Sequence, residues 1–489
     1  MKILWVCNTI PSIIQEALAT QQNQQPSKHT TYTKSGMGFG QKNVKEGWLS
    51  GLCASLFAGQ DDDTPVELAI AYPIARRHAP LHHTISFQTH TINLFAFYEK
   101  VSQPWRYDPS LEKRLRLIIS RLEPDIVHCF GTEYPHTLAL AKVMPDPKRL
   151  LIGIQGIMTW YAQAYDANLP RKVLQRQTFR DWLKRDSIKR QKEKFAQRGL
   201  FEIESIRMTE NIAGRTDFDR AFAKHYNPNA SYHIMNETLR PIFYEELTLS
   251  DEVAKRRIFM SQGDYPIKGL HYALLALPMI RERYPEAHIV IAGNDITRYG
   301  TLKERIKQSQ YAKYLRKLLH DGRIQNHVQF LGELGPERMV DEYQKAGIFL
   351  CASTLENSPN SLGEAMILGT PCVTADVGGI PSIFWDQKDG ILYKGYRNKE
   401  IEFYQLQEQK ESNQGDGQDD GLDDGQDDAM YKQAVRIRDA IFAMWENEEQ
   451  QLLYQEHARI HAKITHDPDS NAKALRDCYT SILQSLDDT

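Results

Sequence analysis

Two glutamates, Glu356 and Glu364, lie eight positions apart in the stretch Ala352–Met366. The stretch follows an apolar run and leads into a predicted helix that begins near Ser361. A strand end, a turn set by Pro359 and the free N–H groups of a helix start together suit an anion such as a diphosphate. Both carboxylates can then face one anion-binding pocket.

The same residues also have a purely structural explanation. Ser361 and Glu364 have the Ser-x-x-Glu spacing of a capping box. A capping box satisfies the first N–H groups of a helix and needs no ligand. On the local sequence alone, both interpretations stay open.

Short strand-like runs alternate with helical patterns along most of the 489 residues. Several runs are apolar at consecutive positions, as in parallel strands covered by helices on both faces. The expected strands are Ile3–Cys7, Val66–Ala71, Ile126–Phe130, Leu150–Ile154 and Asn211–Gly214, then Arg257–Ser261, His288–Ala292, Val328–Leu331, Ile348–Cys351 and Cys372–Ala375. Two such series predict an α/β protein with two doubly wound, Rossmann-like domains facing across a cleft, which is the default ligand site.

The predicted domains are residues 1–240 and 241–465, with a helical tail at 466–489 that packs back on the first domain. Residues 408–428 interrupt the second domain and are rich in Gly, Gln and Asp, so we expect a disordered insertion. This tract holds nine acids and one Lys, so the rest of the chain carries +5 while the whole carries −3. The near balance of charge argues against a dedicated nucleic-acid binder.

Cysteine usage and hydropathy give the expected location. The six cysteines are scattered without a Cys-x-x-Cys pair, as in a protein of a reducing compartment. The N-terminus lacks the features of a signal peptide, and no apolar run approaches the roughly 18 residues that cross a bilayer. We therefore expect a cytoplasmic protein, soluble or peripheral to the plasma membrane.

The segment Arg171–Arg198 is strongly basic, with eleven Lys or Arg against three acids. It also carries an imperfect apolar face at helical spacing. It has two interpretations: a solvated helix face, or a surface that touches anionic lipid or an anionic glycan acceptor.

The Glu-x7-Glu element resembles that of the retaining, nucleotide-sugar-dependent glycosyltransferases of group 1, which have the two-domain GT-B fold. Ile258–Gly269 is similar to their phosphate-binding strand-loop-helix, and Val377–Pro381 to the small-residue loop that follows. Four upstream stretches resemble one bacterial branch of this family: Asp125–Glu133, Ile154–Gly156, Gly214–Asp219 and Asn236–Arg240. The resemblance runs from residue 2 to about residue 395 and resumes near His466.

The resemblance implies roles in binding the donor. Lys268 neutralises the diphosphate, Glu364 accepts hydrogen bonds from the ribose hydroxyls, and Glu356 holds the sugar during catalysis. The remaining implied donor-binding residues are the amides near Asn360, Ser361 and Leu362, the base-lining loop from Gly332 to Leu334, and Gly38 in the glycine-rich stretch 36–40.

One departure from the family concerns a second cation. Related enzymes place an Arg about five residues before the loop Lys, where this chain reads Gln262-Gly263-Asp264. Arg215 and Arg240 are the candidates to replace it.

On the acceptor side, His128 and Glu133 lie at and beyond the end of the strand Ile126–Phe130. Many relatives have a cleft histidine two residues beyond His128, where this chain has Phe130. His128 is therefore a candidate catalytic residue or a core histidine bonded to backbone, and Glu133 and His136 are alternative acceptor-side groups.

The implied reaction moves a sugar to a hydroxyl of a glycan or lipid-linked acceptor, with retained configuration, in surface-polysaccharide biosynthesis. The implied mechanism needs no metal and no cofactor beyond the donor, and neither domain body contains an Asp-x-Asp motif. Two alternatives remain: a nucleotide-sugar epimerase on the same fold, and a non-catalytic scaffold that binds nucleotide sugar. An epimer formed without acceptor marks the first, and binding without turnover marks the second.

Overall fold

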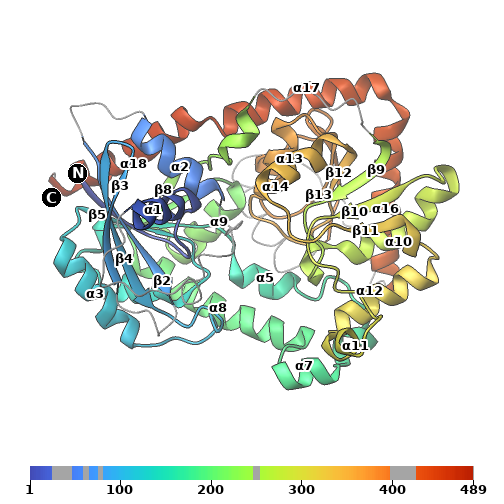
Figure 1. Cartoon of the computed structure of the whole chain (residues 1–489), viewed down its shortest axis with the longest axis horizontal. Coiled ribbons are helices and arrows are strands. Elements are labelled where there is room, and N and C mark those ends of the chain that lie inside the picture. Colours follow the sequence, from blue (N-terminus) through green and yellow to red (C-terminus); the bar gives the residue numbers. More distant parts are fainter. Residues whose placement is uncertain (25–46, 59–64, 75–80, 246–253, 397–425, 488–489) are drawn as a thin grey trace.

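The computed structural model describes residues 1–24, 47–58, 65–74, 81–245, 254–396 and 426–487. Two β-sheets, each flanked by helices, form the two halves of the molecule (Figure 1). The predicted α/β class with two Rossmann-like units is confirmed. The change from one sheet to the other falls between Ile234 and Ala254.

The first sheet has eight strands in the order β3-β4-β2-β1-β5-β6-β7-β8. The pair β3–β4 is antiparallel and the other neighbours are parallel. The strands are β1 (Lys2–Val6), β2 (Glu67–Ile74), β3 (Leu81–Phe87), β4 (His90–Tyr98), β5 (Ile126–Phe130), β6 (Leu150–Gly153), β7 (Asn211–Gly214) and β8 (Ser231–Ile234).

The second sheet has six parallel strands in the order β11-β10-β9-β12-β13-β14. They are β9 (Ala254–Met260), β10 (His288–Ile291), β11 (Val328–Phe330), β12 (Ala346–Cys351), β13 (Cys372–Asp376) and β14 (Gly390–Lys394). Because the sheet is parallel, the loops that follow its strands gather at one edge.

The helices of the first half are α1 (Ser12–Gln24), α2 (Gly47–Ala58), α3 (Ser110–Leu122), α4 (Pro135–Val143), α5 (Met158–Ala164), α6 (Arg171–Gln175), α7 (Phe179–Lys184), α8 (Ile188–Met208) and α9 (Asp217–Tyr226). Those that follow are α10 (Leu270–Arg283), α11 (Leu302–Lys307), α12 (Gln310–Asp321), α13 (Pro336–Gln344), α14 (Asn360–Ile367), α16 (Gln426–Glu446), α17 (Glu448–Thr465) and α18 (Pro468–Asp487). Short 3-10 turns are η2 (Pro147–Arg149), η3 (Pro241–Tyr244), η4 (Pro266–Lys268), η5 (Gln325–His327) and η6 (Ile380–Ser382).

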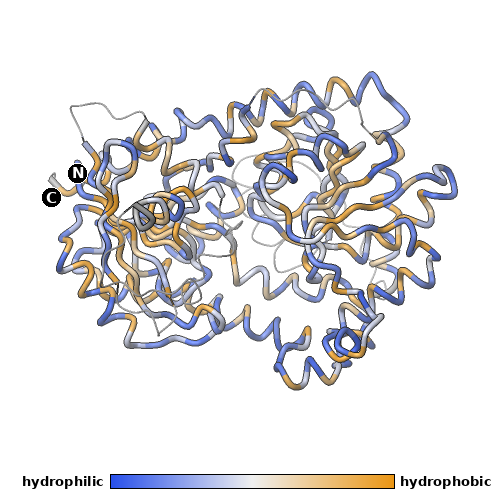
Figure 2. The backbone as a smooth tube through the Cα atoms, viewed as in Figure 1, coloured by the Kyte–Doolittle hydropathy of each residue, from blue (hydrophilic) through white to orange (hydrophobic). Residues whose placement is uncertain are grey.

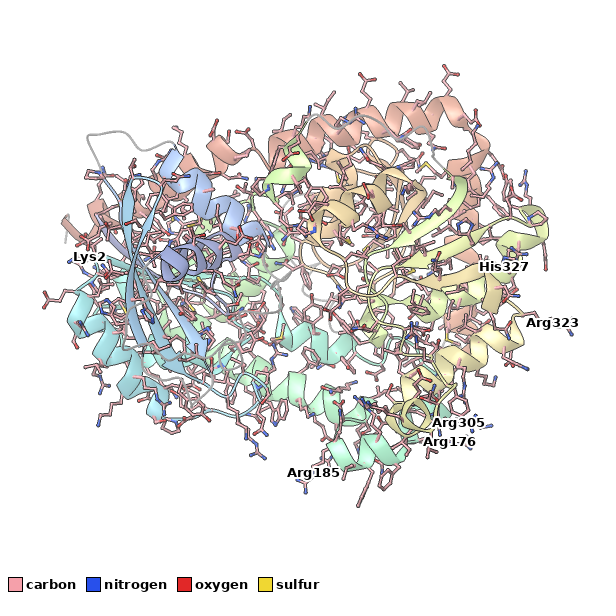
Figure 3. The ribbon with its side chains drawn as sticks, in the orientation of Figure 1. Lys2, Arg176, Arg185, Arg305, Arg323 and His327 are labelled. Atoms are coloured by element: carbon pink, nitrogen blue, oxygen red, sulfur yellow. The ribbon has the colours of Figure 1, made fainter. Side chains whose placement is uncertain are left out.

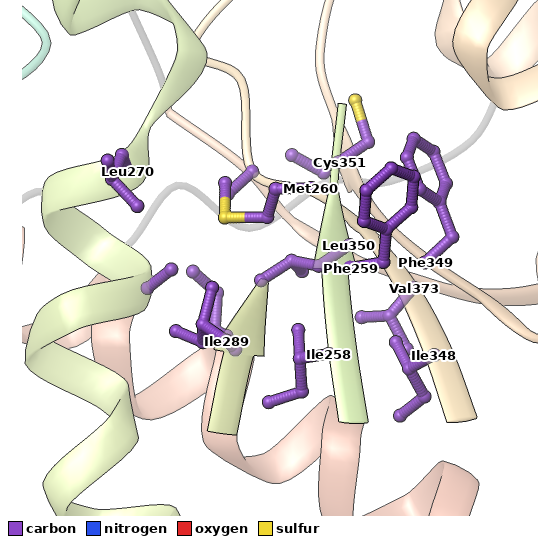
Figure 4. Packing of buried hydrophobic residues seen from close by; sticks show 14 of the residues in the cluster. Ile258, Phe259, Met260, Leu270, Ile289, Ile348, Phe349, Leu350, Cys351 and Val373 are labelled. Atoms are coloured by element: carbon purple, nitrogen blue, oxygen red, sulfur yellow. The ribbon is translucent and has the colours of Figure 1, made fainter. Parts of the chain in front are cut away.

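The strands run through an apolar interior, and the helices turn polar faces outward (Figure 2). In the second sheet the central strands β9 and β12 bury Phe259 and Phe349, and α10 adds Leu270 (Figure 4). Burial on both faces explains why these strands are apolar at consecutive positions. The core thereby fixes the strand ends on which the loops of the cleft are built.

The segment that carries α5 to α8 leaves the first half and packs on the second. Tyr165, Leu169, Val173 and Ile188 belong to the same apolar cluster as strands β9 and β12. Within this segment the carbonyl of Ala167 accepts hydrogen bonds from the ring of His271, at 2.9 Å, and from the hydroxyl of Tyr272, at 2.8 Å, both on α10. The two halves are therefore joined by buried side-chain contacts as well as by the segments of chain that connect them.

The C-terminal helices return to the first half. Helix α17 runs along the second half against α14, and α18 packs on α2 of the first half (Figure 1). The hydroxyl of Tyr479 in α18 accepts a hydrogen bond from Trp5 Nε1 on β1, at 2.8 Å. The prediction of a disordered acidic insertion falls largely outside the described residues. Its last members, residues 426–428, belong to α16.

Candidate active site

A cavity of about 260 Å³ lies between the two halves. Its lining residues from the first half are Asn8, Trp48, Glu133, Gln155, Gly156, Met158, Tyr161 and Arg215. Those from the second half are Glu356, Asn357, Ser358 and Asn360. Most of them follow the carboxyl ends of β1, β5, β6, β7 and β12, so the parallel topology itself brings them together.

Glu356 and Lys268 form a buried ion pair beside this cavity. Lys268 Nζ lies 2.5 Å from Glu356 Oε1, which also accepts a hydrogen bond from the Ser353 hydroxyl at 2.7 Å. Burial acts to lower the pKa of Lys268, but the charge of Glu356 outweighs it and holds that pKa well above its usual value. Lys268 is therefore a cation at the edge of the cavity.

Glu133 reaches the cavity from the loop after β5. Its Oε1 accepts a hydrogen bond from the Gly156 N–H at 3.0 Å, and its Oε2 has no hydrogen-bond partner within the described part of the chain. Burial raises the pKa of Glu133, while the N–H groups and the charge of Arg198 oppose that rise. A buried carboxyl with one oxygen unused is suited to receive a hydroxyl group.

Arg215 follows β7 and joins both halves at the cavity. Its guanidinium forms an ion pair with Glu237, whose other oxygen accepts a hydrogen bond from Asn360 Nδ2 at 2.6 Å. Arg215 also donates to the Ser358 carbonyl at 3.4 Å. Of the two arginines proposed to replace the missing loop arginine, Arg215 lines the cavity.

Arg240, the other candidate, is tied to Glu364 behind the cavity. Its guanidinium lies 2.7 Å from Glu364 Oε1, and the Tyr343 hydroxyl lies 3.1 Å from Oε2. Burial raises the pKa of Glu364, and Arg240 opposes that rise. Glu364 itself is not among the residues that line the cavity.

The capping-box interpretation of Ser361 and Glu364 is wrong. Helix α14 begins at Asn360, its N-cap is Pro359, and no side chain caps it. Ser361 is thus inside the first turn, where its carbonyl accepts a hydrogen bond from Tyr343. The carboxylate of Glu364 pairs with Arg240 and does not cap the helix.

The other predicted donor-side residues are Leu362, Gly332, Leu334 and Gly38. The Leu362 side chain is fully buried in the core, and its N–H donates to the Pro359 carbonyl. Neither the side chain nor the N–H of Leu362 is therefore available to a ligand in the cavity. Gly332 and the buried Leu334 follow β11, and Gly332 pairs with Gly293 after β10 through two backbone hydrogen bonds. Gly38 lies outside the described residues.

His128 lies in the core and not at the cavity. Its Nδ1 lies 2.8 Å from the Tyr479 hydroxyl, and because Trp5 can only donate to that hydroxyl, Tyr479 donates to His128. Burial lowers the pKa of His128 to about 3, so the ring is neutral. The expected catalytic role for His128 is therefore corrected. It is the core histidine of the alternative interpretation, with a side-chain partner instead of backbone.

His136, the other histidine considered, is buried beside Glu99. Its Nδ1 lies 2.6 Å from Glu99 Oε2, and it is likewise absent from the cavity lining. Burial acts to lower the pKa of His136, but the charge of Glu99 dominates and raises it to about 10. The pair is thus a buried internal salt bridge.

Asn357 is a site residue that the sequence did not single out. Its amide nitrogen donates to the Gln155 carbonyl at 2.9 Å and to Asp219 at 3.0 Å, and its oxygen accepts from Thr216 at 2.8 Å. All three partners belong to the first half, so Asn357 fastens the loop of Glu356 across the cleft. In the sequence, only its position directly after Glu356 indicated that Asn357 could belong to the site.

Glu202 on α8 ties together two segments that border the cavity. Its carboxylate accepts hydrogen bonds from Thr132, at 2.6 Å, in the loop after β5, and from the N–H groups of Met158 and Thr159, at 3.0 and 2.9 Å, at the start of α5. Burial raises the pKa of Glu202 to about 7. A polar residue in an amphipathic helix gives no sequence signal of such a role.

Within the described residues, no group of three or more His, Cys, Asp or Glu is placed to hold a metal ion. None of their helices has the length and apolar character needed to cross a membrane.

The matches to known protein sequences fall in the second half. Residues 250–404 match the family model described as glycosyl transferases group 1. Spore coat protein SA of Bacillus subtilis is 29% identical over 134 residues, which are 27% of this chain and 33% of that protein. The D-inositol 3-phosphate glycosyltransferase of Corynebacterium urealyticum is 31% identical over 131 residues, 26% of this chain and 29% of that enzyme. The alignment thus spans about a third of the length of these relatives.

Solved structures share the fold of the whole chain. Sucrose-phosphate synthase from Thermosynechococcus elongatus matches with a TM-score of 0.62 and 12% identity, over 99% of this chain and 100% of that one. HepE of Anabaena, in complex with UDP and glucose, matches with a TM-score of 0.56 and 12% identity, over 98% and 100%. The chain therefore has the GT-B fold, and its residues 250–404 match the model of the group 1 glycosyl transferases.

Proposed function

We propose that the protein is a retaining, metal-independent glycosyltransferase that moves a sugar from a nucleotide-diphosphate sugar to a hydroxyl of a glycan or lipid-linked acceptor. The observation that carries the proposal is the cavity shared by the two halves, with Glu356 on one wall and Glu133 on the other. Two partly buried cations, Lys268 and Arg215, accompany these carboxylates.

The cations fit the charge of a diphosphate. Lys268 and Arg215 neutralise the donor diphosphate, and the amides of Asn360 and Ser361 at the start of α14 add N–H donors with a favourable dipole. Glu356 contacts the sugar from its position beside Lys268. Arg215 thus supplies the second charge that the Gln262-Gly263-Asp264 loop lacks.

In this proposal the nucleoside binds beyond the diphosphate, at the carboxyl ends of the strands of the second sheet. Glu364 accepts hydrogen bonds from the ribose hydroxyls, in exchange for part of its contact with Arg240. The base lies against the loop Gly332–Leu334. A side-chain carbon built at Gly332 or at Gly293 meets no atom within 4 Å, which supports open space of the kind a flat ring needs.

The chemical step needs only groups of the donor and acceptor. The donor bond between C1 and the diphosphate oxygen breaks, and the diphosphate leaves with the electron pair. The acceptor oxygen bonds to C1 from the same face, and its proton passes to the leaving diphosphate. The chain positions the reactants and stabilises the charge that develops on the diphosphate, while Glu133 orients the acceptor hydroxyl.

Similar proteins support the substrate classes. HepE structures contain UDP, glucose and UDP-glucose, which supports a nucleotide-sugar donor. Matched curated enzymes include phosphatidyl-myo-inositol mannosyltransferases, which supports a lipid-linked acceptor. A lipid-linked acceptor makes peripheral contact with an anionic membrane part of the proposal, as is a role in surface-polysaccharide biosynthesis. The cytoplasmic location stays a prediction.

The test begins with a thermal-shift screen of UDP-, GDP- and ADP-sugars, because a bound donor stabilises the folded state. The stabilising donor is then incubated with and without an acceptor. We expect nucleoside diphosphate release that rises with acceptor. An epimerised donor formed without acceptor would support the epimerase, and binding without turnover would support the scaffold.

A further inference from the structure

We propose that a knob formed by α7 and α11 docks the protein onto an anionic lipid bilayer. The knob comprises residues 178–186 and 301–307. The two helices contact each other, although α7 belongs to the first half and α11 to the second (Figure 1). The inference gives the proposed membrane contact a defined surface, and its test measures binding without any sugar transfer.

The outer face of α7 is apolar. Phe179, Trp182 and Leu183 are 65%, 62% and 64% exposed. Their spacing of three and four residues puts them on one side of the helix. The rings of Phe179 and Trp182 lie 5.9 Å apart, so they form one contiguous patch. Large side chains of this kind, exposed together, mark an interaction surface.

The inner face of α7 is firmly held, so this exposure does not come from loose packing. Asp181 is buried and accepts hydrogen bonds from the N–H groups of Thr178, at 3.0 Å, and Gln310, at 2.9 Å. The Thr178 hydroxyl donates to the Gln308 carbonyl at 2.7 Å. These bonds fix α7 against the start of α12. The apolar face of α7 therefore points away from the protein.

Helix α11 repeats the pattern. Leu302 and Ile306, one helical turn apart, are 73% and 54% exposed. A capping box of Thr301 and Glu304 defines the start of this helix as well. The knob therefore presents apolar side chains from two well-formed helices.

The charges around the patch are of one sign. Within residues 171–190 and 301–307, the charged side chains of the exposed class are Lys or Arg, and Figure 3 shows Arg176, Arg185 and Arg305 projecting from this end of the molecule. Of the acids, Asp181 is buried, Asp186 pairs with Arg180, and Glu304 serves its capping box. Exposed cations that flank aromatic and aliphatic side chains match an anionic membrane interface.

This combination favours a bilayer over two other occupants. A soluble anionic glycan uses the cations and can stack on the rings of Phe179 and Trp182, but it does not cover the aliphatic Leu183, Leu302 and Ile306. A second copy of the knob brings like charges face to face. Only an anionic lipid surface offers both negative charge and an apolar layer within reach of Trp182.

The experiment is flotation of the purified full chain with vesicles of phosphatidylcholine alone or mixed with phosphatidylglycerol. We expect binding to the anionic vesicles only, weakened by salt because the charge attraction is screened. A Phe179→Ser/Trp182→Ser variant should lower the vesicle affinity about tenfold or more. A Lys184→Glu/Arg185→Glu variant should lower it similarly at low salt.

Matched controls are Leu452→Ser/Ile460→Ser and Lys463→Glu, which change exposed side chains of the same kind on α17. The inference predicts that these variants bind vesicles as the parent does. It is overturned if the parent does not bind anionic vesicles, if the knob and control variants bind equally, or if the knob substitutions instead dissociate a dimer seen by light scattering. Donor binding by the knob variants, followed by calorimetry, should equal that of the parent, so a failure here leaves the proposed transfer reaction untouched.

Discussion

Lys268 Nζ and Glu356 Oε1 lie 2.5 Å apart in a buried ion pair, although 88 positions separate them in sequence. Lys268 ends η4, just before α10, and Glu356 lies in the loop between β12 and α14. The pair thereby joins the two strand-to-helix connections that flank the centre of the second sheet. It also places a cation and an anion together where the proposed reaction needs both.

Substitution of Lys268 by Ala should weaken donor binding. The change removes the ammonium beside the diphosphate, and a hydrogen bond between charged groups is worth about 1.5–3 kcal/mol. Titration calorimetry should therefore show a rise in the donor Kd of about tenfold to a hundredfold. Lys463→Ala, an exposed lysine on α17, is the matched control. An unchanged Kd for Lys268→Ala would remove the assignment.

Substitution of Asn357 by Ala should loosen the two halves. It removes three hydrogen bonds, to Gln155, Thr216 and Asp219, and leaves buried groups unpaired. We expect a loss of about 1–3 kcal/mol in the free energy of unfolding. Scanning calorimetry measures it, with Asn294→Ala, an exposed asparagine bonded to Glu333, as the control. Equal melting temperatures for the two variants would show that Asn357 fastens nothing.

His128 should make stability fall in acid. Its pKa is lowered by burial to about 3, whereas an unfolded histidine titrates near 6.5. The unfolded chain alone takes up this proton between those values, so the contribution is complete above pH 6.5 and falls by about 1.4 kcal/mol for each pH unit below it.

The check for His128 is a His128→Gln variant, whose amide oxygen can still accept from Tyr479. Denaturant unfolding between pH 6 and pH 4 should show a shallower decline for this variant, by about 1.4 kcal/mol per pH unit. His320→Gln, on the exposed surface of α12, should decline as the parent does. An identical decline for His128→Gln and the parent would contradict the assignment of His128 to the core.

Removal of divalent metal should leave transfer unchanged. The proposed step uses Lys268 and Arg215 as the charges that balance the diphosphate, so the rate with a chelator should equal the rate without it. The measurement is nucleoside diphosphate release with and without EDTA. Complete loss of release, restored by Mn²⁺, would contradict the metal-independent mechanism.

The strands that were predicted contain short apolar runs. In β5, in β12 and in the Ile258–Met260 end of β9 the run is covered on both faces, and that pattern was visible in the sequence. The sequence prediction missed β3, β4, β8 and β14. β8 has no buried residue, and β3 alternates exposed with covered positions in an antiparallel edge hairpin. Their pairing is set by neighbouring strands rather than by their own composition.

The candidate site divides in the same way. Arg215 follows β7 of the first sheet, and Lys268 and Glu356 follow β9 and β12 of the second, so the parallel topology of each sheet placed them at the carboxyl ends of its strands. The sequence left His128 open between a catalytic and a core role, because its place in the core is shown only by its contact with Tyr479 of the distant C-terminal helix. Glu202 and Asn357 act through bonds between segments far apart in sequence, which no local pattern reports.

The central claim, retaining sugar transfer at Glu356, is tested most directly by proton NMR of the reaction with the donor found by thermal shift. We predict that the product carries the anomeric configuration of the donor and that Glu356→Gln binds donor but forms product at least about a hundredfold more slowly. A product of inverted configuration, or a Glu356→Gln rate equal to that of the parent, would contradict the account.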